Sequence, residues 1–444
     1  MMRIAYLCAD LGIPYHGGKA GALHMRQTVS ALANFGHEVC VFATGTNEAG
    51  ETCETGAAGA VNSETNVTLV PLDKTTFSAQ MRIRRITDSL LPQSRLHKDI
   101  RGALYSETFY ECAMNILPQW KPDIIYERHS LWGQAGLKIA RKLNVPHLLE
   151  INAHLSEETE ERRGLTMLEL AQSIERHVIE ETDAAVCVSI QLAQKLKKDY
   201  QLSMPILTLP AGVDVESFRP DISPVSVRRK WNLEDKFVIG FAGSMKLWHG
   251  LDLLLEAFPR VLYEVPNACL FFVGNASTEQ ENAFSNTPVR ERENIISAGQ
   301  VCHDRMPEHL AAMDICVLPG SNQYGAPMKL FEYMAMRKPI IAPRLDVIQE
   351  VVTDNISALL FDEGDVDQLT RTLVRFAKNP KDADDFAGAA RDQALEKHTT
   401  QRRAESLTQF AEEVIARHRN PGGKETHNSI YPTPQPGIAG HGKG

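Results

Sequence analysis

Two series of short apolar runs, each alternating with segments of helical periodicity, are the strongest constraint on the fold of this 444-residue chain. The first apolar run, at 4–8, is followed by a glycine-containing loop, a helix-like segment that stops at Gly36, and a second apolar run at 38–43. A strand, a helix and a strand in this order form parallel strands joined by a right-handed crossover. The pattern therefore predicts an α/β protein with parallel sheets.

The alternation continues along the chain and is interrupted once. Further strand-like runs of the first series lie at 67–70, 124–126, 147–150, 184–189 and 206–209. Residues 210–226 contain three prolines and no helical period, which is typical of a linker. The second series has strand-like runs at 237–243, 270–274, 295–296, 315–319, 339–342 and 359–361. We therefore expect two doubly wound, Rossmann-like domains facing an interdomain cleft, with ligands beyond the carboxyl ends of the strands.

Domain boundaries follow from these patterns. We place an N-terminal domain at 1–210, a linker at 211–226 and a C-terminal domain at 227–385. C-terminal helices are expected at 386–418, packing back toward the N-terminal domain. Residues 45–65 are rich in small and polar residues and predict a long surface loop, and the Gly- and Pro-rich residues 419–444 predict a disordered tail.

Composition argues against several classes of protein. The net charge of −9 disfavours a broad nucleic-acid-binding surface. The sequence contains no run of about 18 apolar residues, so we expect no membrane-spanning helix. Asp10 interrupts the first apolar run too early for a signal-peptide core, so we expect a cytoplasmic protein. The eight cysteines form no C-x-x-C pair and no zinc-finger spacing, so we expect neither a structural disulfide nor a metal site.

Residues 243–250 follow the first strand of the second series and precede a helix. Lys246 and His249 are candidate cations on this loop, at the carboxyl end of the strand. A leaving nucleoside diphosphate gains negative charge as its bond breaks, and such cations would stabilise it. A solvated lysine on an ordinary turn is the alternative interpretation.

A second loop, at 324–328, also follows a strand. Gly325 and Pro327 shape it, and Lys329 stands near the start of the next helix, where N–H groups and an ammonium would converge on one anion. Glu332 shares a helix face with Lys329 and could accept hydrogen bonds from a ribose diol. An i, i+3 ion pair on a solvated helix is the alternative.

Two further positions give weaker signals. Gly17 and Gly18 separate a strand from a helix, and their missing side chains let backbone N–H groups approach a phosphate or sugar. The pair does not form the G-x-G-x-x-G of dinucleotide-binding folds, and a plain turn is the alternative. Glu350 begins another apolar run, and a carboxylate at the start of a helix is its simplest interpretation.

Taken together, these motifs resemble those of the family 4 glycosyltransferases of the GT-B fold. The matching stretches, in the order in which they occur, are Gly17-Gly18 with the helix ending at 36–39, then 183–189, 210–220, 243–250, 306–314, and 329–335 with Lys338-Pro339. They span about residues 1–418. The resemblance implies retaining transfer of a sugar from a nucleotide-sugar donor to a hydroxyl acceptor, without a bound metal or other cofactor.

The resemblance also implies roles for individual residues. The second domain would bind the nucleotide, with Glu332 on the ribose, and the first would supply the acceptor surface. The expected donor-binding residues are Gly17, Gly18, Gly243, Ser244, Gly325, Ala326, Pro327, Met328, Leu330 and Glu332, and those expected to act on the reacting groups are Lys246, Lys329, His249 and Arg128.

The chain departs from the family pattern at several of these positions. The diphosphate-binding Arg and Lys of the family fall on Ser244 and His249, so Lys246 and Lys329 are the expected substitutes. The first Glu of the paired-glutamate motif is Tyr324, and backbone groups of 325–328 could make its contacts instead.

Two smaller departures lie in the linker and in the first domain. The Asn often seen in the linker motif is Ala211. After the strand at 124–126, where the family often has a His, the chain offers Arg128 or His129, and spacing favours Arg128.

A basic segment lies within the acidic chain. Residues 81–101 carry six Lys or Arg and two Asp, interleaved with apolar residues. Such a stretch in the acceptor domain suits an anionic membrane surface or a lipid-linked acceptor, which would place the protein at the inner face of the membrane. A solvated helix packed on its own domain is the alternative.

Three functions remain open on the sequence. A glycosyltransferase in polysaccharide, lipopolysaccharide or glycolipid assembly fits the motifs best. A nucleotide-sugar epimerase of the same fold would convert the donor without an acceptor. A non-catalytic nucleotide-sugar-binding protein is compatible with the replacements at Ser244 and Tyr324.

Overall fold

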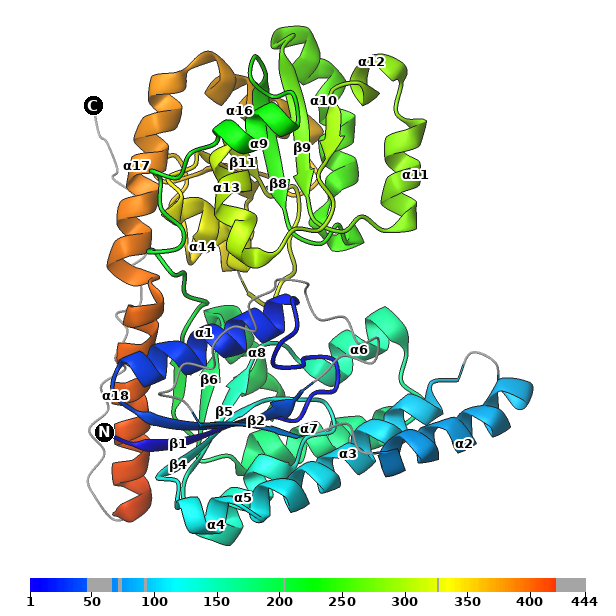
Figure 1. Ribbon diagram of the computed structural model, residues 1–444, viewed down its shortest axis with the longest axis vertical. Helices are drawn as coiled ribbons and strands as arrows, with labels where there is room; N and C mark the ends of the chain where they lie inside the picture. Colours follow the sequence, from blue (N-terminus) through cyan, green and yellow to red (C-terminus); the bar gives the residue numbers. More distant parts are fainter. Residues whose placement is uncertain are drawn as a thin grey trace.

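The computed structural model describes residues 1–45, 66–70, 74–91, 94–200, 202, 204–325 and 327–420 of the chain. Two parallel sheets with helices around them form two units, which lie one above the other in Figure 1. The predicted architecture of two doubly wound α/β domains is confirmed. The loop predicted at 45–65 and the tail predicted at 419–444 lie, beyond their first residues, outside the described residues.

The first sheet has seven strands in the order β3-β2-β1-β4-β5-β6-β7. The strands are β1 (Arg3–Cys8), β2 (Glu38–Thr44), β3 (Asn66–Val70), β4 (Ile124–Arg128), β5 (His147–Ile151), β6 (Ala184–Cys187) and β7 (Ile206–Thr208). The strand order reverses between β1 and β4, so the loops after these two strands border the crevice where such sheets bind ligands. Gly17, Gly18 and His129 lie in those loops, and Arg128 ends β4.

Eight helices connect the described strands of the first domain and cover the two faces of its sheet. They are α1 (Ala20–Asn34), α2 (Lys74–Leu90), α3 (Leu96–Met114), α4 (Leu117–Trp120), α5 (Ala135–Leu143), α6 (Leu155–Arg163), α7 (Leu168–Glu181) and α8 (Ile190–Tyr200). The pair α2 and α3 packs side by side and projects from the domain at the lower right of Figure 1.

The second sheet has six strands in the order β10-β9-β8-β11-β12-β13. The strands are β8 (Phe237–Ala242), β9 (Ala268–Val273), β10 (Ile295–Ser297), β11 (Ile315–Val317), β12 (Ile340–Pro343) and β13 (Leu359–Phe361). Its strand order reverses between β8 and β11. The loop that begins at Gly243 and the segment that contains Tyr324 follow these two strands, so both lie at the crevice of the second sheet.

The second domain and the C-terminal segment hold the remaining described helices. They are α9 (Val225–Lys230), η1 (Leu247–His249), α10 (Leu251–Glu264), α11 (Thr278–Asn286), α12 (Val289–Arg292), η2 (His303–Arg305), α13 (Met306–Ala311), α14 (Met328–Ala335), α15 (Asp346–Gln349), α16 (Val366–Lys378), α17 (Pro380–Lys397) and α18 (Thr400–Arg419). The segment expected as linker, 211–226, runs into α9 at its end.

Alternation along β1 explains how the first sheet is covered on both faces. Ile4, Tyr6 and Cys8 belong to an apolar cluster that also includes residues of α1 and α18, whereas Ala5 and Leu7 belong to a second cluster with α3 and α5. Side chains of a strand alternate between its faces, so a fully apolar strand must be covered on both sides. The first domain therefore includes α18 in its core, although α18 follows the second domain in sequence.

The C-terminal helices divide between the domains. Of the helices expected at 386–418, α17 holds residues 386–397 and packs on α14 of the second domain, whereas α18 packs on α1 of the first. Between α17 and α18, the backbone of Val213 pairs with His398 and Thr400: the Val213 N–H donates to the His398 carbonyl at 2.8 Å, and the Thr400 N–H donates to the Val213 carbonyl at 3.0 Å. Two chain segments thus run side by side where the domains join.

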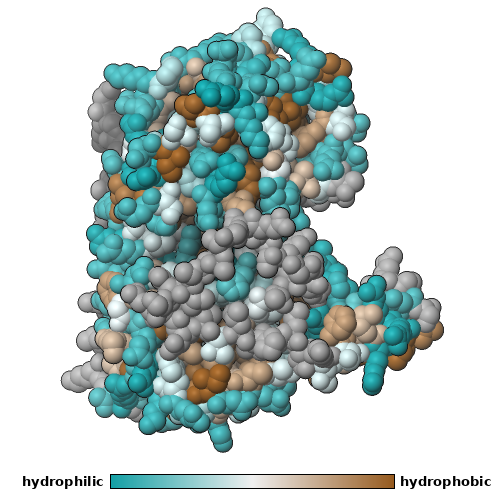
Figure 2. Space-filling model, in the orientation of Figure 1, coloured by the Kyte–Doolittle hydropathy of each residue, from teal (hydrophilic) through white to brown (hydrophobic). Residues whose placement is uncertain are grey.

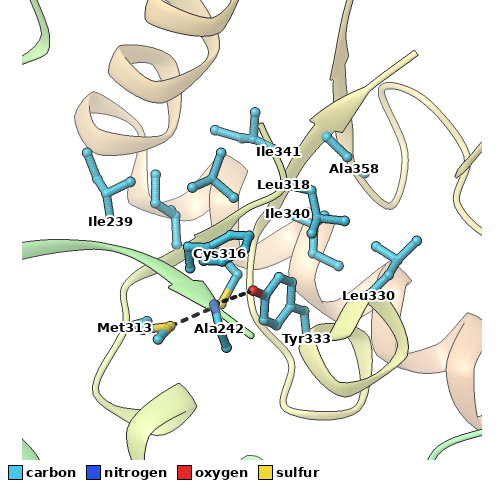
Figure 3. Close-up of a cluster of buried hydrophobic side chains, with 14 of the residues drawn as sticks. Ile239, Ala242, Met313, Cys316, Leu318, Leu330, Tyr333, Ile340, Ile341 and Ala358 are labelled. Atoms are coloured by element: carbon cyan, nitrogen blue, oxygen red, sulfur yellow. Dashed lines mark hydrogen bonds between the residues drawn. The ribbon is translucent and has the colours of Figure 1, made fainter. Parts of the chain in front are cut away.

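The core of the second domain fixes α14 against the end of β8. Figure 3 shows Tyr333 of α14 among apolar side chains of β8, β11 and β12, with its hydroxyl directed at Ala242. The Ala242 N–H donates to this hydroxyl at 2.8 Å. Because Ala242 is the last residue of β8, this bond sets the height of α14 relative to the loop that begins at Gly243.

Candidate active site

The site begins where β8 ends and the chain turns at Gly243. Gly243 has a φ of +123°, in a region that side chains disfavour, and a Cβ there would lie 2.7 Å from Lys329 Nζ. The neighbouring strand β9 is followed by Gly274, where a Cβ would lie 2.1 Å from the Gly243 carbonyl oxygen. Two adjacent strands are therefore each followed by a glycine, and the space that side chains would fill is occupied by backbone and by the Lys329 ammonium.

Lys329, near the start of α14, is buried with 9% of its surface exposed. Its Nζ lies 4.0 Å from the centre of the Phe241 ring and 3.4 Å from His249 Nε2. Among the described residues, no carboxylate forms an ion pair with it. Burial lowers the pKa of Lys329 to about 7, against the raising effect of Glu332. Burial, reinforced by the charge of Lys329, lowers the pKa of His249 to about 3. A neutral His249 can therefore accept a hydrogen bond from Lys329.

Lys338 is a useful comparison because it is a second, mostly buried lysine on the same domain. Its Nζ donates to the carbonyls of Ala311 at 2.9 Å and Met313 at 2.7 Å. The Lys338 ammonium thus satisfies the end of α13 and the turn after it, which is a structural role. Lys329 has a ring face and a neutral imidazole instead, so it retains the capacity to bind an anion.

Glu332 lies one turn after Lys329 on α14 and is also buried. Its Oε1 lies 2.9 Å from His303 Nε2, and the His303 ring lies 5.2 Å from the Phe218 ring. Among the described residues, Oε2 of Glu332 has no hydrogen-bond partner, so that oxygen can accept from a ligand. His303 was not predicted from the sequence: it stands in η2, 29 residues before Glu332, and no spacing rule connects the two.

The remaining predicted residues of the second domain lie in or near the same loops. Ser244 and Lys246 are exposed, and the Lys246 N–H donates to the Ser244 carbonyl at 3.0 Å. Gly325, Pro327 and Met328 are half-buried, and Ala326 lies outside the described residues.

Leu330 has a side chain that belongs to the core, where Figure 3 shows it beside Tyr333. Its N–H donates to the Pro327 carbonyl at 2.9 Å. The side chain and the N–H of Leu330 therefore both make contacts within the fold, and Leu330 stabilises the loop before α14.

The two predicted glycines of the first domain lie in the loop after β1, and Gly18 lies near the second domain. The Gly17 N–H closes a turn on the Pro14 carbonyl at 2.9 Å, and Arg26 Nη1 donates to the Gly17 carbonyl at 2.9 Å. A Cβ on Gly18 would lie 3.9 Å from the side-chain amide nitrogen of Gln300 in the second domain. Gly18 is thus exposed on the face that meets the second domain.

Arg128 is part of a buried ionic cluster of the first domain. Its Nη1 donates to Glu150 Oε1 at 2.6 Å and lies 3.2 Å from His24 Nδ1. The Tyr126 hydroxyl donates to Glu150 Oε2 at 2.5 Å, and Arg403 of α18 lies 3.5 Å from the same oxygen. Burial alone would raise the pKa of Glu150, but His24, Arg128 and Arg403 hold it well below its usual range. Glu150 therefore neutralises the charge of Arg128.

His129 points to a different carboxylate. Its Nε2 lies 3.2 Å from Oε1 of Glu175. The Leu155 N–H donates to the same oxygen at 2.7 Å, and the Ser156 N–H donates to Oε2 at 3.0 Å. Burial would raise the pKa of Glu175, but its contacts with His129 and the N–H groups outweigh burial and lower it to about 2. Glu175 thereby anchors the first turn of α6.

Glu350 is not at the start of a helix, which corrects the sequence interpretation. It follows the last residue of α15, and both of its carboxylate oxygens accept from the Ile190 N–H of the first domain, at 3.1 and 3.0 Å. Two residues 160 positions apart thus meet across the domain boundary, a contact that the apolar run after Glu350 could not reveal.

A separate groove lies away from these residues. It has a volume of about 650 Å³ and runs between α10 and α16, lined by Tyr263, Arg371 and other polar side chains. Three of its charged residues already pair with acids: Arg260 with Asp367, Lys378 with Glu264 and Arg375 with Asp382. None of the predicted site residues lines this groove.

Solved structures of the same architecture include glycosyltransferases. Sucrose-phosphate synthase from Thermosynechococcus elongatus superposes with a TM-score of 0.68, covering 94% of this chain and 100% of that one at 18% identity. The Anabaena protein HepE, in complex with UDP, gives a TM-score of 0.67 at 14% identity, covering 93% of this chain and 100% of that one. With the loops after β8 and β11 at the crevice of the second sheet, the protein has the GT-B fold of glycosyltransferases.

Two family models match adjoining parts of the chain. The model described as Glycosyltransferase Family 4 matches residues 21–217, and the model described as Glycosyl transferases group 1 matches residues 236–379. The chain belongs to the family 4 glycosyltransferases. The predicted family is therefore confirmed, and the boundary between the two matches falls in the segment after β7.

Curated relatives agree with this family. A GDP-mannose-dependent alpha-(1-6)-phosphatidylinositol monomannoside mannosyltransferase of Mycolicibacterium smegmatis is 24% identical over 240 residues, covering 52% of this chain and 63% of that protein. A D-inositol 3-phosphate glycosyltransferase of Segniliparus rotundus is 25% identical over 257 residues, covering 55% of this chain and 56% of that protein. The chain thus spans about three fifths of the length of the curated relatives it matches.

None of the helices in the described ranges combines the length and the apolarity needed to span a bilayer.

Proposed function

We propose that the protein is a retaining glycosyltransferase that moves a sugar from a nucleotide-sugar donor to a hydroxyl acceptor, with the donor as substrate and no metal cofactor. The observation that carries the proposal is the buried Lys329 of α14. Its ammonium faces the turn at Gly243, after the carboxyl end of β8, and has no acidic partner among the described residues. A buried ammonium is costly unless an anion or other acceptors satisfy it.

The diphosphate of the donor is such an anion. Lys329 lies near the N-terminus of α14, where backbone N–H groups and the helix dipole also favour negative charge. Glu332 lies one turn further on, and its Oε1 contacts His303 Nε2 at 2.9 Å. We propose that its other carboxylate oxygen accepts hydrogen bonds from the ribose of the same nucleotide. Ser244 and Lys246, exposed on the neighbouring loop, would complete the diphosphate site.

The proposed transfer takes place on one face of the sugar. The bond between the anomeric carbon and the diphosphate oxygen breaks, the acceptor oxygen bonds to the same face of that carbon, and the acceptor proton passes to the leaving phosphate oxygen. The protein supplies position and charge: Lys329 stabilises the charge that develops on the leaving group, and the first domain holds the acceptor. The pathway we propose is polysaccharide, lipopolysaccharide or glycolipid assembly, in the cytoplasm.

The test is a thermal-shift panel of nucleoside diphosphates and nucleotide sugars. GDP and UDP compounds come first, because the mannosyltransferase relatives are named as GDP-mannose-dependent and HepE was solved with UDP. We expect a rise in melting temperature with one base, which Glu332→Ala abolishes and Lys329→Ala weakens. The control is Lys338→Ala, which lowers the melting temperature without changing the shift. A panel in which the wild type responds to no nucleotide would refute the proposal.

Mass spectrometry of the products separates the proposed transfer from the alternatives. Transfer or slow hydrolysis of the nucleotide sugar supports a glycosyltransferase. Conversion of the sugar without an acceptor would instead show a nucleotide-sugar epimerase. Binding without any conversion, over a broad acceptor panel, would show a nucleotide-sugar-binding protein.

We further propose that the acceptor is lipid-linked and that the pair α2 and α3 contacts an anionic membrane. The observation is a row of exposed apolar residues on α2 and just after it: Ile86, Leu90 and Leu91 are 63%, 73% and 58% exposed. Arg82 and Arg85 are exposed on the same helix. Figure 2 shows brown and teal side chains mixed on this projecting part at the lower right. Apolar residues among arginines fit the interface of an anionic bilayer.

Flotation with vesicles tests the membrane proposal. We expect salt-sensitive binding to vesicles that contain phosphatidylglycerol and little binding to pure phosphatidylcholine. Arg82→Glu and Ile86→Ser should each weaken binding, whereas Arg371→Glu, on the exposed surface of α16, should not. Equal binding by all four proteins, or none by the wild type, would exclude this surface.

A further inference from the structure

We propose that Ser189 and Glu350 are positioning residues that lock the turn at Tyr324 and Gly325 onto the first domain, so that closure of the two domains sets the loop that faces the donor sugar. The inference deepens the proposed function and rests on it for the identity of the loop. The contacts themselves are properties of the fold and can be tested without a substrate.

The N-terminus of α8 is the first part of this contact. The Ser189 hydroxyl donates to the Tyr324 carbonyl of the second domain, and the same oxygen accepts from the Leu192 N–H at 3.1 Å. Ser189 is buried, with 1% of its surface exposed. One side chain therefore caps a helix of the first domain and fixes a backbone group of the loop before α14.

Glu350 is the second part. Its carboxylate reaches from the end of α15 to the same helix N-terminus and accepts from the Ile190 N–H at 3.1 and 3.0 Å. Burial raises the pKa of Glu350, and the Ile190 and Gln191 amides oppose that rise. A carboxylate at a helix N-terminus is stabilised by unpaired N–H groups and the helix dipole. The two domains thus share one helix terminus.

Tyr324 and Gly325 supply the third part by packing. Tyr324 is half-buried against the apolar cluster formed by residues 137–200 of the first domain. A Cβ on Gly325 would lie 3.0 Å from Cγ2 of Val188, so a side chain there would require Val188 or the loop to shift. Tyr324, which stands where the family motif has its first glutamate, therefore packs between the domains in this protein.

The charges around Tyr324 explain why an acid would be unfavourable at this position. Burial raises the pKa of Tyr324. Glu157, Glu161 and Glu158 of α6 raise this pKa further, and Lys195 opposes the rise. These three acids face the hydroxyl from the first domain. A glutamate in place of Tyr324 would meet like charge when the domains close, whereas a tyrosine can pack there.

A neighbouring contact links the other donor loop to the first domain. The Arg162 guanidinium of α6 lies 4.2 Å from the centre of the Trp248 ring, in η1 beside His249. The loop after β8 and the loop before α14 therefore both touch the first domain, through α6 and α8. Positioning of reacting groups through such closure accounts for large rate effects of residues that touch no substrate.

Hydrogen exchange tests the interdomain contacts at the N-terminus of α8 in the protein without ligand. Glu350→Ala changes only the second domain, yet we expect exchange of the amides in the first turn of α8, including Ile190, to become about ten-fold faster. Glu350→Gln, whose amide oxygen can still accept, should restore most of the protection. The control is Asp365→Ala, which removes the helix cap that accepts from the Gln368 N–H at 2.8 Å within the second domain, and it should leave α8 unchanged. Unchanged exchange in Glu350→Ala would overturn the proposal.

Turnover tests the positioning role. We expect Ser189→Ala to lower kcat for the donor by about ten-fold or more while the affinity for the nucleoside diphosphate stays within about two-fold. Ser189→Thr, which keeps the hydroxyl, should recover activity. Loss of nucleotide affinity equal to the loss of kcat, or full activity in Ser189→Ala, would refute the role. A wild type that binds no nucleotide would refute the proposed function alone, and the exchange experiment would still decide whether the lock exists.

Discussion

Replacing Lys329 with methionine should stabilise the protein while it weakens nucleotide binding. The folded-state pKa of Lys329 is about 7 and its ordinary value is 10.5. Between these two values the unfolded chain binds more protons than the folded one, so the free energy of unfolding rises with pH in that window. This difference between the two pKa values lowers the free energy of unfolding by about 4 kcal/mol at pH 7 and by about 2 kcal/mol at pH 9.

Methionine has a similar length and no charge, so Lys329→Met removes this cost and keeps most of the packing against Phe241. We expect the free energy of unfolding at pH 7 to rise by up to about 4 kcal/mol, and the difference from the wild type to shrink by about half at pH 9. Loss of one charge-assisted hydrogen bond should weaken nucleoside diphosphate binding about 10- to 100-fold.

The assay is chemical denaturation from pH 7 to pH 9, with isothermal titration of the nucleotide that gives the largest thermal shift. Lys338→Met is the matched control: its ammonium satisfies the carbonyls of Ala311 and Met313, so its loss should destabilise the fold by about 1–3 kcal/mol. The reasoning fails if Lys329→Met is less stable than the wild type at pH 7, or if the difference between them does not depend on pH.

Three further outcomes can be measured with the same methods. Gly243→Ala should lower the free energy of unfolding by about 1–3 kcal/mol and impair binding, because its φ is +123° and its Cβ would meet the Lys329 ammonium. Glu150→Gln should cost about 3–5 kcal/mol, because Arg128 would remain buried without its charge partner; a loss below 1 kcal/mol would contradict this. His303→Phe should leave stability within about 1 kcal/mol and weaken nucleotide binding, since it frees Glu332 to move; unchanged affinity would exclude a positioning role.

Much of the fold could be predicted because its signals are local. Each strand is an apolar run bounded by turn residues, and the parallel arrangement follows from the helix-like segments between them. The segment around 210–226 was identifiable because proline and the loss of periodicity occur together. The division of the C-terminal helices could not be predicted: α17 and α18 are nearly continuous in sequence, and only the pairing of Val213 with Thr400 separates them.

The candidate site was predictable where its residues lie close together in the sequence, and unpredictable where two distant segments meet. Lys329 and Glu332 stand one turn apart on α14, so helical spacing was enough. His303 lies 29 residues from Glu332, and Ile190 lies 160 residues from Glu350. Such contacts depend on the order of strands in the sheets and on the closure of the domains, which no short pattern contains.

The distribution of buried charge differs between the two domains and bears on which of them would bind an anionic ligand. In the first domain, the buried carboxylates are matched: Glu150 by Arg128 and Glu175 by His129 and backbone N–H groups. In the second domain, Lys329 is buried with no carboxylate in ion-pair contact among the described residues. A matched cluster gains little from a ligand charge, whereas an unmatched ammonium gains strongly from an anion. Among these buried groups, Lys329 is therefore the one expected to gain most from an anionic ligand, which in the proposed reaction is the diphosphate of the donor.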